Sequence, residues 1–231
     1  MPEAVIFDID GTLLDSVDLH AQAWQEAFRH FGHEIPFQEI RSQIGKGGDQ
    51  LLPVFLSEQE LKEKGEPLQE YRGRLFKEKY LHRVKPFPGV RDLFQKIKSN
   101  GQQAALASSA KGDELKVFER IANIEDLVEV ETSSADAERS KPHPDIFEAA
   151  LDRLGKKVRR EQAIVVGDSP HDAEAAKRAG LAAVGVRCGG FPEPALREAG
   201  CVAIYDGPED ILRHYEESPL ARQATARAPG R

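Results

Sequence analysis

The side chains best suited to chemistry in this chain are carboxylates that follow short apolar segments. Asp8 and Asp10 follow the first apolar run, and Asp168 and Asp172 follow another run far downstream. A carboxylate can attack an electrophilic centre such as phosphorus, transfer a proton, or bind a hard cation such as Mg²⁺. Acidic groups placed in this way therefore indicate metal-assisted chemistry on an anionic substrate.

A hydroxyl and an ammonium group complete the set that phosphoryl transfer requires. Ser108 ends the second apolar run, and Lys141 lies in the loop region after the third. A fixed cation and hydroxyl donors stabilise the oxygens of a transferring phosphoryl group, where charge collects in the transition state. An acid must also protonate the leaving alkoxide, and a carboxylate nucleophile would form an aspartyl-phosphate that splits hydrolysis into two steps.

The apolar runs themselves predict a parallel sheet. Five continuous runs are interpreted as strands buried on both faces: residues 4–7, 103–107, 127–130, 163–166 and 182–186. Helix patterns lie between them, as over 90–97 and over 169–180, where Ser-Pro begins a helix and Gly ends it. This alternation predicts a Rossmann-like, doubly wound α/β core, in which ligands collect at the carboxyl ends of the strands.

Residues 17–85 break the alternation and are predicted to form an inserted α-helical cap domain. They show helical spacing and no convincing buried strand. Helices are expected around residues 50–56 and 68–82, with turn-rich segments at 32–36, 45–48 and 65–67. The core is then discontinuous, formed by residues 1–16 and 86–231. Residues 218–231 are rich in Ala, Arg and Pro without apolar periodicity, which predicts a loose tail.

Composition narrows the classes of partner. The 32 Lys and Arg residues against 39 Asp and Glu give a formal net charge of -7, which argues against nucleic-acid binding. No membrane-spanning or secretory segment is recognised, and Cys188 and Cys201 lack a CxxC spacing that would indicate zinc or disulfides. The expected protein is cytoplasmic and acts on a small phosphorylated metabolite; the sequence leaves its oligomeric state open.

Four segments, in order, resemble the signature motifs of the haloacid dehalogenase-like (HAD) phosphohydrolase superfamily. They are residues 8–16 (DIDGTLLDS), the apolar run ending in Ser108, residues 141–145 (KPHPD) and residues 167–172 (GDSPHD). Residues 86–90 (PFPGV) also resemble the family's linker back from a helical cap. The resemblance covers nearly the whole chain except the C-terminal tail.

The resemblance implies a role for each acidic residue. Asp8 would be the nucleophile and a metal ligand, and Asp10 the general acid/base, which also offers its backbone carbonyl to the metal. Asp168 would bind Mg²⁺, with Asp172 as a second or water-mediated ligand. From the residues alone, Asp172 could also be the capping-box partner of Ser169, and the two roles are compatible.

The resemblance also assigns the groups around the carboxylates. Ser108 and Lys141 would hold the phosphoryl group, and Thr12 would help to position Asp10. Gly11, which precedes Thr12, and Ser109, which follows Ser108, are expected to help position these groups or the substrate. Taken one at a time these residues have structural explanations, such as a turn at Asp10-Gly11.

Asp10 favours phosphatase or phosphomutase chemistry, because the family's dehalogenases lack a carboxylate there. The alternative to a phosphatase is a β-phosphoglucomutase-like enzyme, which residues 15–24 also resemble. Against it, Asp49 stands in the region of the mutases' phosphate-binding arginine, and Asp168 and Asp172 are not an adjacent acidic pair. A weaker alternative is a non-catalytic binding or regulatory member of the family. Such a protein would be expected to have lost Asp8, Asp10, Lys141 or Asp168, and all four are present.

The predicted cap offers candidates for substrate contact. Residues 44–49 (IGKGGD) resemble the cap loop of phosphoglycolate phosphatases, and Lys46 lies within it. The same residues could form a turn between helices, and a Schiff-base role of Lys46 in phosphonate hydrolysis has no other support. His20 and Trp24 lie four residues apart on the first predicted cap helix, so both could face the cleft.

Overall fold

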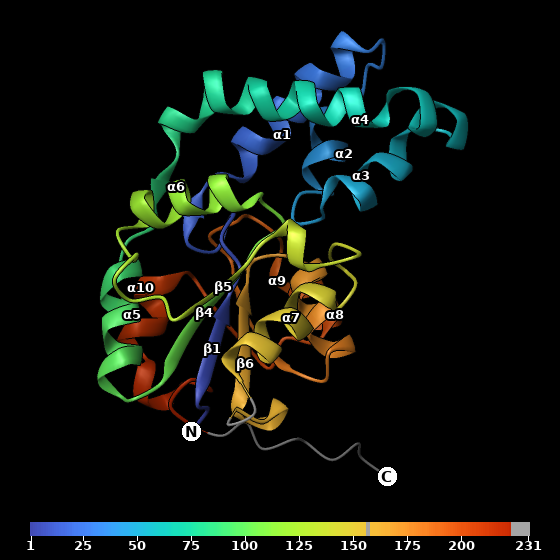
Figure 1. Cartoon of the computed structure of the whole chain (residues 1–231). Coiled ribbons are helices and arrows are strands. Elements are labelled where there is room, and N and C mark those ends of the chain that lie inside the picture. Colours follow the sequence, from blue (N-terminus) through green and yellow to red (C-terminus); the bar gives the residue numbers. More distant parts are fainter. Residues whose placement is uncertain (156–157, 223–231) are drawn as a thin grey trace.

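Six parallel strands form the central sheet, in the order β5-β4-β1-β6-β7-β8 (Figure 1). The computed structural model describes residues 1–155 and 158–222. The strands are β1 (Ala4–Phe7), β4 (Gln103–Ala107), β5 (Val130–Thr132), β6 (Ala163–Gly167), β7 (Ala182–Val186) and β8 (Ala203–Tyr205). Because the strand order reverses at β1, the crevice beside the end of β1 is where this topology gathers ligands.

The register of the sheet aligns the predicted site residues. Phe7 at the end of β1 pairs with Leu106 of β4 on one side and with Val166 of β6 on the other. Asp8, Ser108 and Asp168 therefore follow three neighbouring strands at almost the same level.

Side-chain alternation along the strands divides the core into two apolar layers. Val5 and Phe7 face the layer covered by α5 (Val90–Ser99), α6 (Gly112–Ala122) and α10 (Pro208–Arg213). Ala4 and Ile6 face the layer covered by α7 (Asp145–Leu154) and α8 (Pro170–Arg178), and α9 (Glu193–Ala199) packs beside α8. Burial on both faces explains the continuous apolar runs of the sequence.

Helices alone span the chain between the two short strands β2 (Leu14–Asp15) and β3 (Lys85–Pro86), which pair antiparallel. They are α1 (Val17–His30), α2 (Phe37–Arg41), α3 (Gly48–Phe55), α4 (Glu58–Leu75), a π-helical turn (Phe76–Tyr80) and a 3-10 turn (Leu81–Arg83). An apolar cluster of their own includes Trp24, Phe28 and Leu51. These helices lie over the carboxyl ends of the strands (Figure 1). Further 3-10 turns are Ser134–Asp136, Arg160–Gln162 and Tyr215–Glu217.

The predicted turn at residues 65–67 is wrong, because these residues lie inside α4. Ser57 begins this helix with a capping box that its side chain shares with Glu60. Gly65 is buried, and a Cβ atom there would lie 3.8 Å from the Leu52 side chain. That distance is an ordinary van der Waals contact, so Gly65 is a helix-interior residue of α4 and does not mark a chain reversal.

The edges of the core also differ from the sequence interpretation. The strand predicted over 127–130 begins only at Val130, because Leu127 ends a hydrogen-bonded turn and packs into the core. The edge strand β8 was missed, although residues 201–205 (CVAIY) are a short apolar run; its residues are only half-buried. The tail prediction fails at its start, because Ser218 and Leu220 are fully buried. Residues 223–231 of that tail lie outside the described residues.

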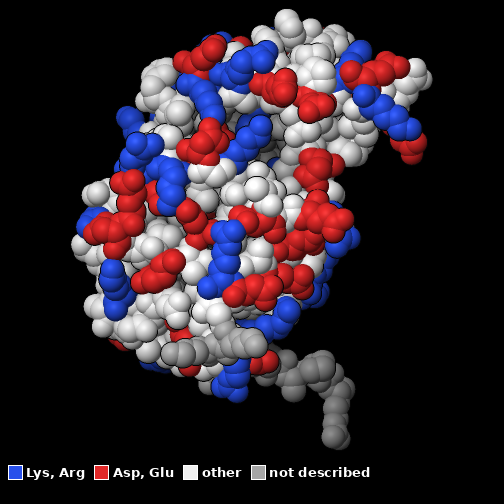
Figure 2. All heavy atoms as spheres, viewed as in Figure 1, with Lys and Arg blue, Asp and Glu red and all other residues white. Residues whose placement is uncertain are grey.

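The surface carries both signs of charge. Figure 2 shows acidic and basic side chains interspersed over the helical cap region and the sheet region on this face. Among the described residues, no helix combines the length and apolarity needed to cross a membrane.

Candidate active site

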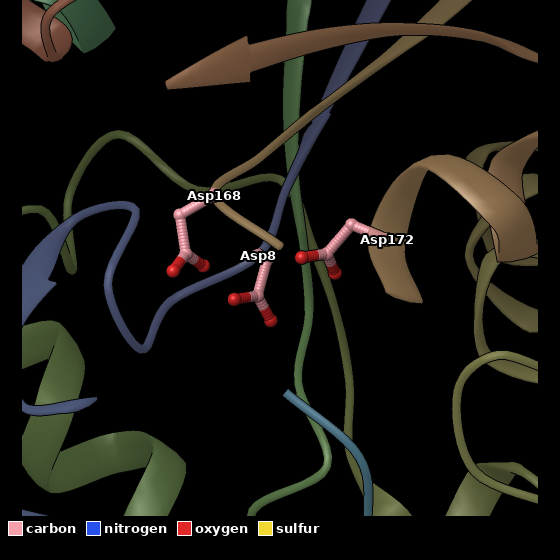
Figure 3. A group of neighbouring side chains, drawn as sticks. All are labelled: Asp8, Asp168 and Asp172. Carbon is pink, nitrogen blue, oxygen red and sulfur yellow. The ribbon is translucent and has the colours of Figure 1, made fainter. Parts of the chain in front are cut away.

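Three aspartate side chains converge at the carboxyl ends of β1 and β6. Asp8 follows β1, Asp168 follows β6, and Asp172 lies in the first turn of α8 (Figure 3). Each offers a carboxylate oxygen within 4.8 Å of the others, and all three residues are at least 96% buried, with Asp8 the most exposed at 4%. Buried carboxylates so close together repel one another unless a cation or protons compensate them.

The residues fit a hard divalent cation. Asp8 Oδ2 and Asp168 Oδ2 are buried and have no hydrogen-bond partner among the described residues. Burial raises the pKa of Asp8 to about 7, with Lys141 opposing and the charges of Asp172 and Asp10 adding to the rise. Burial also raises the pKa of Asp168 well above its usual range, together with the charges of Asp172 and Asp8. Oxygen ligands in this arrangement match the preference of Mg²⁺.

Two glycines make room for the Asp168 carboxylate. A Cβ atom at Gly11 or at Gly189 would overlap the Asp168 side chain, and Gly11 also has a φ of +82°, which disfavours other residues. The predicted positioning role of Gly11 thus has a steric explanation. A side chain at either glycine would displace a candidate metal ligand.

The capping-box role predicted for Asp172 is confirmed, and its carboxylate also lies within the acidic cluster. Ser169 N and Oγ donate to Asp172 Oδ2 at 3.1 and 2.6 Å, and Asp172 N donates back to Ser169 Oγ, which forms a capping box at the start of α8. Asp172 Oδ1 instead faces Lys141 Nζ at 2.8 Å. The capping box therefore fixes the Asp172 carboxylate with its second oxygen directed toward Asp8 and Asp168.

Lys141 supplies the buried positive charge of the site. Its ammonium group forms ion pairs with Asp8 and Asp172, and the residue is 1% exposed. Although burial lowers the pKa of this lysine, the charges of Asp172 and Asp8 outweigh that effect and raise it. Lys141 is therefore positively charged and lies against the predicted nucleophile.

Ser108 presents its hydroxyl at the end of β4. Its backbone N–H donates to Thr132 O at 3.1 Å, and its Oγ accepts from Ala110 N at 3.1 Å. The hydroxyl hydrogen is then available to donate to a ligand oxygen. The next residue, Ser109, lines the cavity in front of Asp8.

Asp10 is held by two donors that both bond to Oδ1. Ser16 Oγ donates at 2.5 Å, and His20 Nε2 lies 2.8 Å away. Burial alone would raise the pKa of Asp10, but His20, Ser16 and Arg72 together lower it. Among the described residues, no side chain donates a hydrogen bond to Oδ2, so that oxygen is free to exchange a proton with a ligand.

Arg72 determines which nitrogen of His20 carries the proton. The Arg72 guanidinium contacts His20 Nδ1, and because arginine has only donors, Nδ1 must accept. Nε2 then carries the hydrogen and donates to Asp10. The His20 ring is 4% exposed and stacks on Phe76 with centroids 4.0 Å apart, which fixes its orientation.

Thr12 does not contact Asp10 as predicted. Its hydroxyl donates to Asp168 Oδ1 at 3.3 Å, and the residue is fully buried. Ser16 and His20 position Asp10 instead. Ser16 lies six residues after Asp10, and the turn between β1 and α1 brings the two side chains together.

Contacts between the helical cap and the core close over the site. Asp49 Oδ2 accepts from Ser140 N at 3.1 Å, directly before Lys141. Arg41 Nη2 donates to Gly189 O at 2.8 Å, beside Asp168. Asp49, which stands in the region of the mutases' arginine, is therefore engaged in joining the cap loop to the core.

A cavity of about 660 Å³ lies between the cap and the core. Asp8, Asp10, His20, Trp24, Lys46 and Ser109 all line it, so both predicted cap-helix residues do face the cleft. Lys46 is half-buried, and its ammonium donates to Gln43 Oε1 at 2.5 Å. Arg72 and Glu114 also line the cavity, and sequence reasoning missed both, because neither belongs to a motif.

Comparison with known proteins decides the family. Residues 5–186 match the family model described as haloacid dehalogenase-like hydrolase. The chain belongs to the haloacid dehalogenase-like hydrolase family. The matched range contains all four motif segments, which lie between residues 8 and 172.

Individual relatives agree with this membership. The chain is 32% identical over 219 residues to a protein named phosphorylated carbohydrates phosphatase from Thermotoga maritima, covering 93% of this chain and 99% of the relative. The crystal structure of a hydrolase from Pseudomonas syringae superposes with a TM-score of 0.85 at 27% identity, covering 93% and 98% of the two chains. A protein assigned as a β-phosphoglucomutase from Bacteroides vulgatus shares the fold, with a TM-score of 0.83, 21% identity and coverage of 96% and 91%.

Mg²⁺ is expected to stabilise this hydrolase against heat. Binding to the acidic cluster of the folded state alone should raise Tm by about 3–6 °C at a tenfold excess over Kd. Thermal unfolding with and without MgCl₂ measures this increment. Asp168→Asn should remove the increment, whereas Asp206→Asn, which changes an exposed carboxylate that pairs with Arg187 outside the cluster, should keep it. An equal increment in both variants would place the metal elsewhere.

Proposed function

We propose that the protein is an Mg²⁺-dependent phosphatase that hydrolyses a small phosphate monoester through an aspartyl-phosphate on Asp8. The observation that carries this proposal is that Asp8 and Asp10 line one cavity, with Lys141 paired to Asp8, beside a cluster suited to a cation. A nucleophile, a charge-neutralising lysine and a separate acid/base are the groups that two-step hydrolysis requires.

In the first step a carboxylate oxygen of Asp8 attacks phosphorus. The new P–O bond forms as the bond to the leaving oxygen breaks, and Asp10 donates a proton to that oxygen. Lys141 and Ser108 hold the equatorial oxygens, which carry the charge of the transition state. Mg²⁺ held by Asp8, Asp168 and Asp172 would offset the repulsion between the nucleophile and the anionic ester.

In the second step Asp10 acts as a base. It takes a proton from water, which attacks the phosphoryl group on Asp8 and releases inorganic phosphate and the free Asp8 carboxylate. The lowered pKa of Asp10 in the free protein suits this base role. A bound phosphoester dianion would raise that pKa by charge repulsion and so favour the protonated form needed in the first step.

Hydrolysis is favoured over mutase chemistry by the engagement of Asp49. A mutase must hold a second phosphate, and Asp49 places a negative charge, bonded to Ser140, in the region where the mutases carry arginine. The relative from Thermotoga maritima is named a phosphatase of phosphorylated carbohydrates, which supports the same choice. The cytoplasmic location expected from the sequence stays a prediction.

Assay of the purified protein with an aryl phosphate tests the proposal. Phosphate release should require Mg²⁺, stop on addition of EDTA and return with excess Mg²⁺. A screen over phosphoglycolate, hexose phosphates, nucleotides and polyol phosphates would then define the substrate. Conversion of β-glucose 1-phosphate to glucose 6-phosphate without phosphate release would favour the mutase, and absence of turnover on every ester would refute the enzyme.

A further inference from the structure

One part of the cavity wall has no role in the two chemical steps. Glu114, in the first turn of α6, is 8% exposed, and its Oε1 is buried without a hydrogen-bond partner among the described residues. Arg72, on α4 of the cap, likewise has a buried Nε without a partner in the described chain. Polar groups left in this way cost free energy, so they are typical of a site that a ligand completes.

Glu114 and Arg72 act on each other across the cavity. Burial lowers the pKa of Arg72, while the charges of Glu114 and Asp10 oppose that effect. The structure shows no ion pair between Glu114 and Arg72 within the described residues, although both line the same cavity. The Arg72 guanidinium instead lies 5.1 Å from the centroid of the Trp24 ring, which holds it in place.

The two residues lie on the leaving-group side of the reaction. Asp8, Ser108 and Lys141 surround the position of the phosphoryl group, and Asp10 must reach the leaving oxygen. Arg72 connects to Asp10 through His20, so the rest of the leaving alcohol has to extend into the space that Arg72 and Glu114 line.

The other charged residues that line the cavity are less suited to selecting the leaving group. Lys46 already donates to Gln43 Oε1, and the remaining ones are exposed: Glu66, Glu70, Arg74, Lys77 and Lys111. Water and salt screen exposed charges, whereas the buried Glu114 carboxylate and the half-buried Arg72, whose Nε is buried, interact more strongly with whatever lies between them.

The chemistry of this pair matches hydroxyl groups. An ionised carboxylate only accepts hydrogen bonds, a guanidinium only donates them, and a hydroxyl does both. A carboxylate on the ligand would meet Arg72 favourably, but Glu114 would repel it at close range and low dielectric. Resting on the proposed phosphatase activity, we propose that Glu114 and Arg72 recognise the leaving group and select an alcohol with further hydroxyls over one with a carboxylate.

Glu114→Gln tests this selection, because it keeps the size of the side chain and removes its charge. The wild type is expected to hydrolyse hexose 6-phosphates or polyol phosphates with a higher kcat/KM than phosphoglycolate. In Glu114→Gln, kcat/KM for the preferred hydroxylated substrate should fall about 10- to 100-fold, as for loss of a charged hydrogen bond. The value for phosphoglycolate should stay or rise, and that for an aryl phosphate without hydroxyls should stay within about threefold.

Glu119→Gln is the matched control. Glu119 is a second buried glutamate of α6, 2% exposed, but it pairs with Lys116 away from the cavity. Its substitution should leave the ratio between the three substrates unchanged. Thermal unfolding of each variant verifies folding, and Glu114→Asp, which keeps the charge, should recover part of the selectivity.

The outcomes separate this inference from the proposed function. An active phosphatase whose Glu114→Gln variant keeps the wild-type ratio of hydroxylated substrate to phosphoglycolate would overturn the inference alone. An equal loss on all three substrates would also overturn it, because Glu114 would then serve the chemistry or the fold. Failure of the wild type on the aryl phosphate would instead overturn the proposed function.

Discussion

Asp8→Asn is expected to reduce kcat for every phosphate monoester by at least about 1,000-fold, because an amide cannot form the acyl-phosphate bond. The variant should fold, since Asn matches Asp in size and the backbone of residue 8 remains bonded to Val166 O at 2.9 Å. Lys141 also keeps Asp172 as an ionic partner. Steady-state assays with an aryl phosphate measure the loss of kcat, and thermal unfolding measures whether the variant folds.

A direct test of the nucleophile is trapping of the phosphoenzyme. Acid quenching of the wild type during turnover of a radiolabelled ester should retain label on the protein, and Asp8→Asn should retain none. Asp15→Asn is the matched control, because Asp15 belongs to the same motif but is exposed on β2. It should label and turn over within about twofold of the wild type. Residual activity of Asp8→Asn within tenfold of the wild type would disprove the assignment.

Asp10→Asn should separate esters by the basicity of their leaving groups. An alkoxide needs the proton from Asp10, so formation of the phosphoenzyme from an alkyl phosphate should slow by about 100- to 10,000-fold. A nitrophenolate leaves without a proton, so the same step with an aryl phosphate should slow by less than about tenfold.

Pre-steady-state kinetics makes this difference visible. With the aryl phosphate, Asp10→Asn should release a stoichiometric burst of phenol and then turn over slowly, because the base that activates water is missing. With the alkyl phosphate no burst should occur. Equal slowing of the first step for both esters would show that Asp10 is not the acid and that it serves binding or folding.

Local sequence signals predicted the parts of the site that depend on neighbouring residues. The helix over 169–180 is confirmed as α8, because Ser169, Pro170 and Gly180 are a cap, a first-turn proline and a terminating glycine. The buried strands are confirmed where apolarity is continuous, as in β1 and β6. Where burial is partial, as in β8, or where glycine and proline lie inside a helix, as in α4, the same signals failed.

Local sequence signals could not predict contacts between segments that are far apart in the chain. Arg72 is 52 residues from His20, and Glu114 lies on a helix of the core, so no spacing rule connects them. The family resemblance assigned Thr12 to Asp10, yet the turn after β1 directs its hydroxyl to Asp168. Which side chain reaches which carboxylate depends on the path of the turn and on the docking of the cap.

The sequence by itself determined the α/β core, the helical insertion and the acidic residues at the strand ends, because burial and helix capping act on residues that are close along the chain. The tertiary structure alone decided that His20 and Arg72 orient Asp10, that Asp49 joins the cap to the Lys141 loop, and that Glu114 lines the cavity. These contacts cross between cap and core, where only the packed arrangement sets distance and charge.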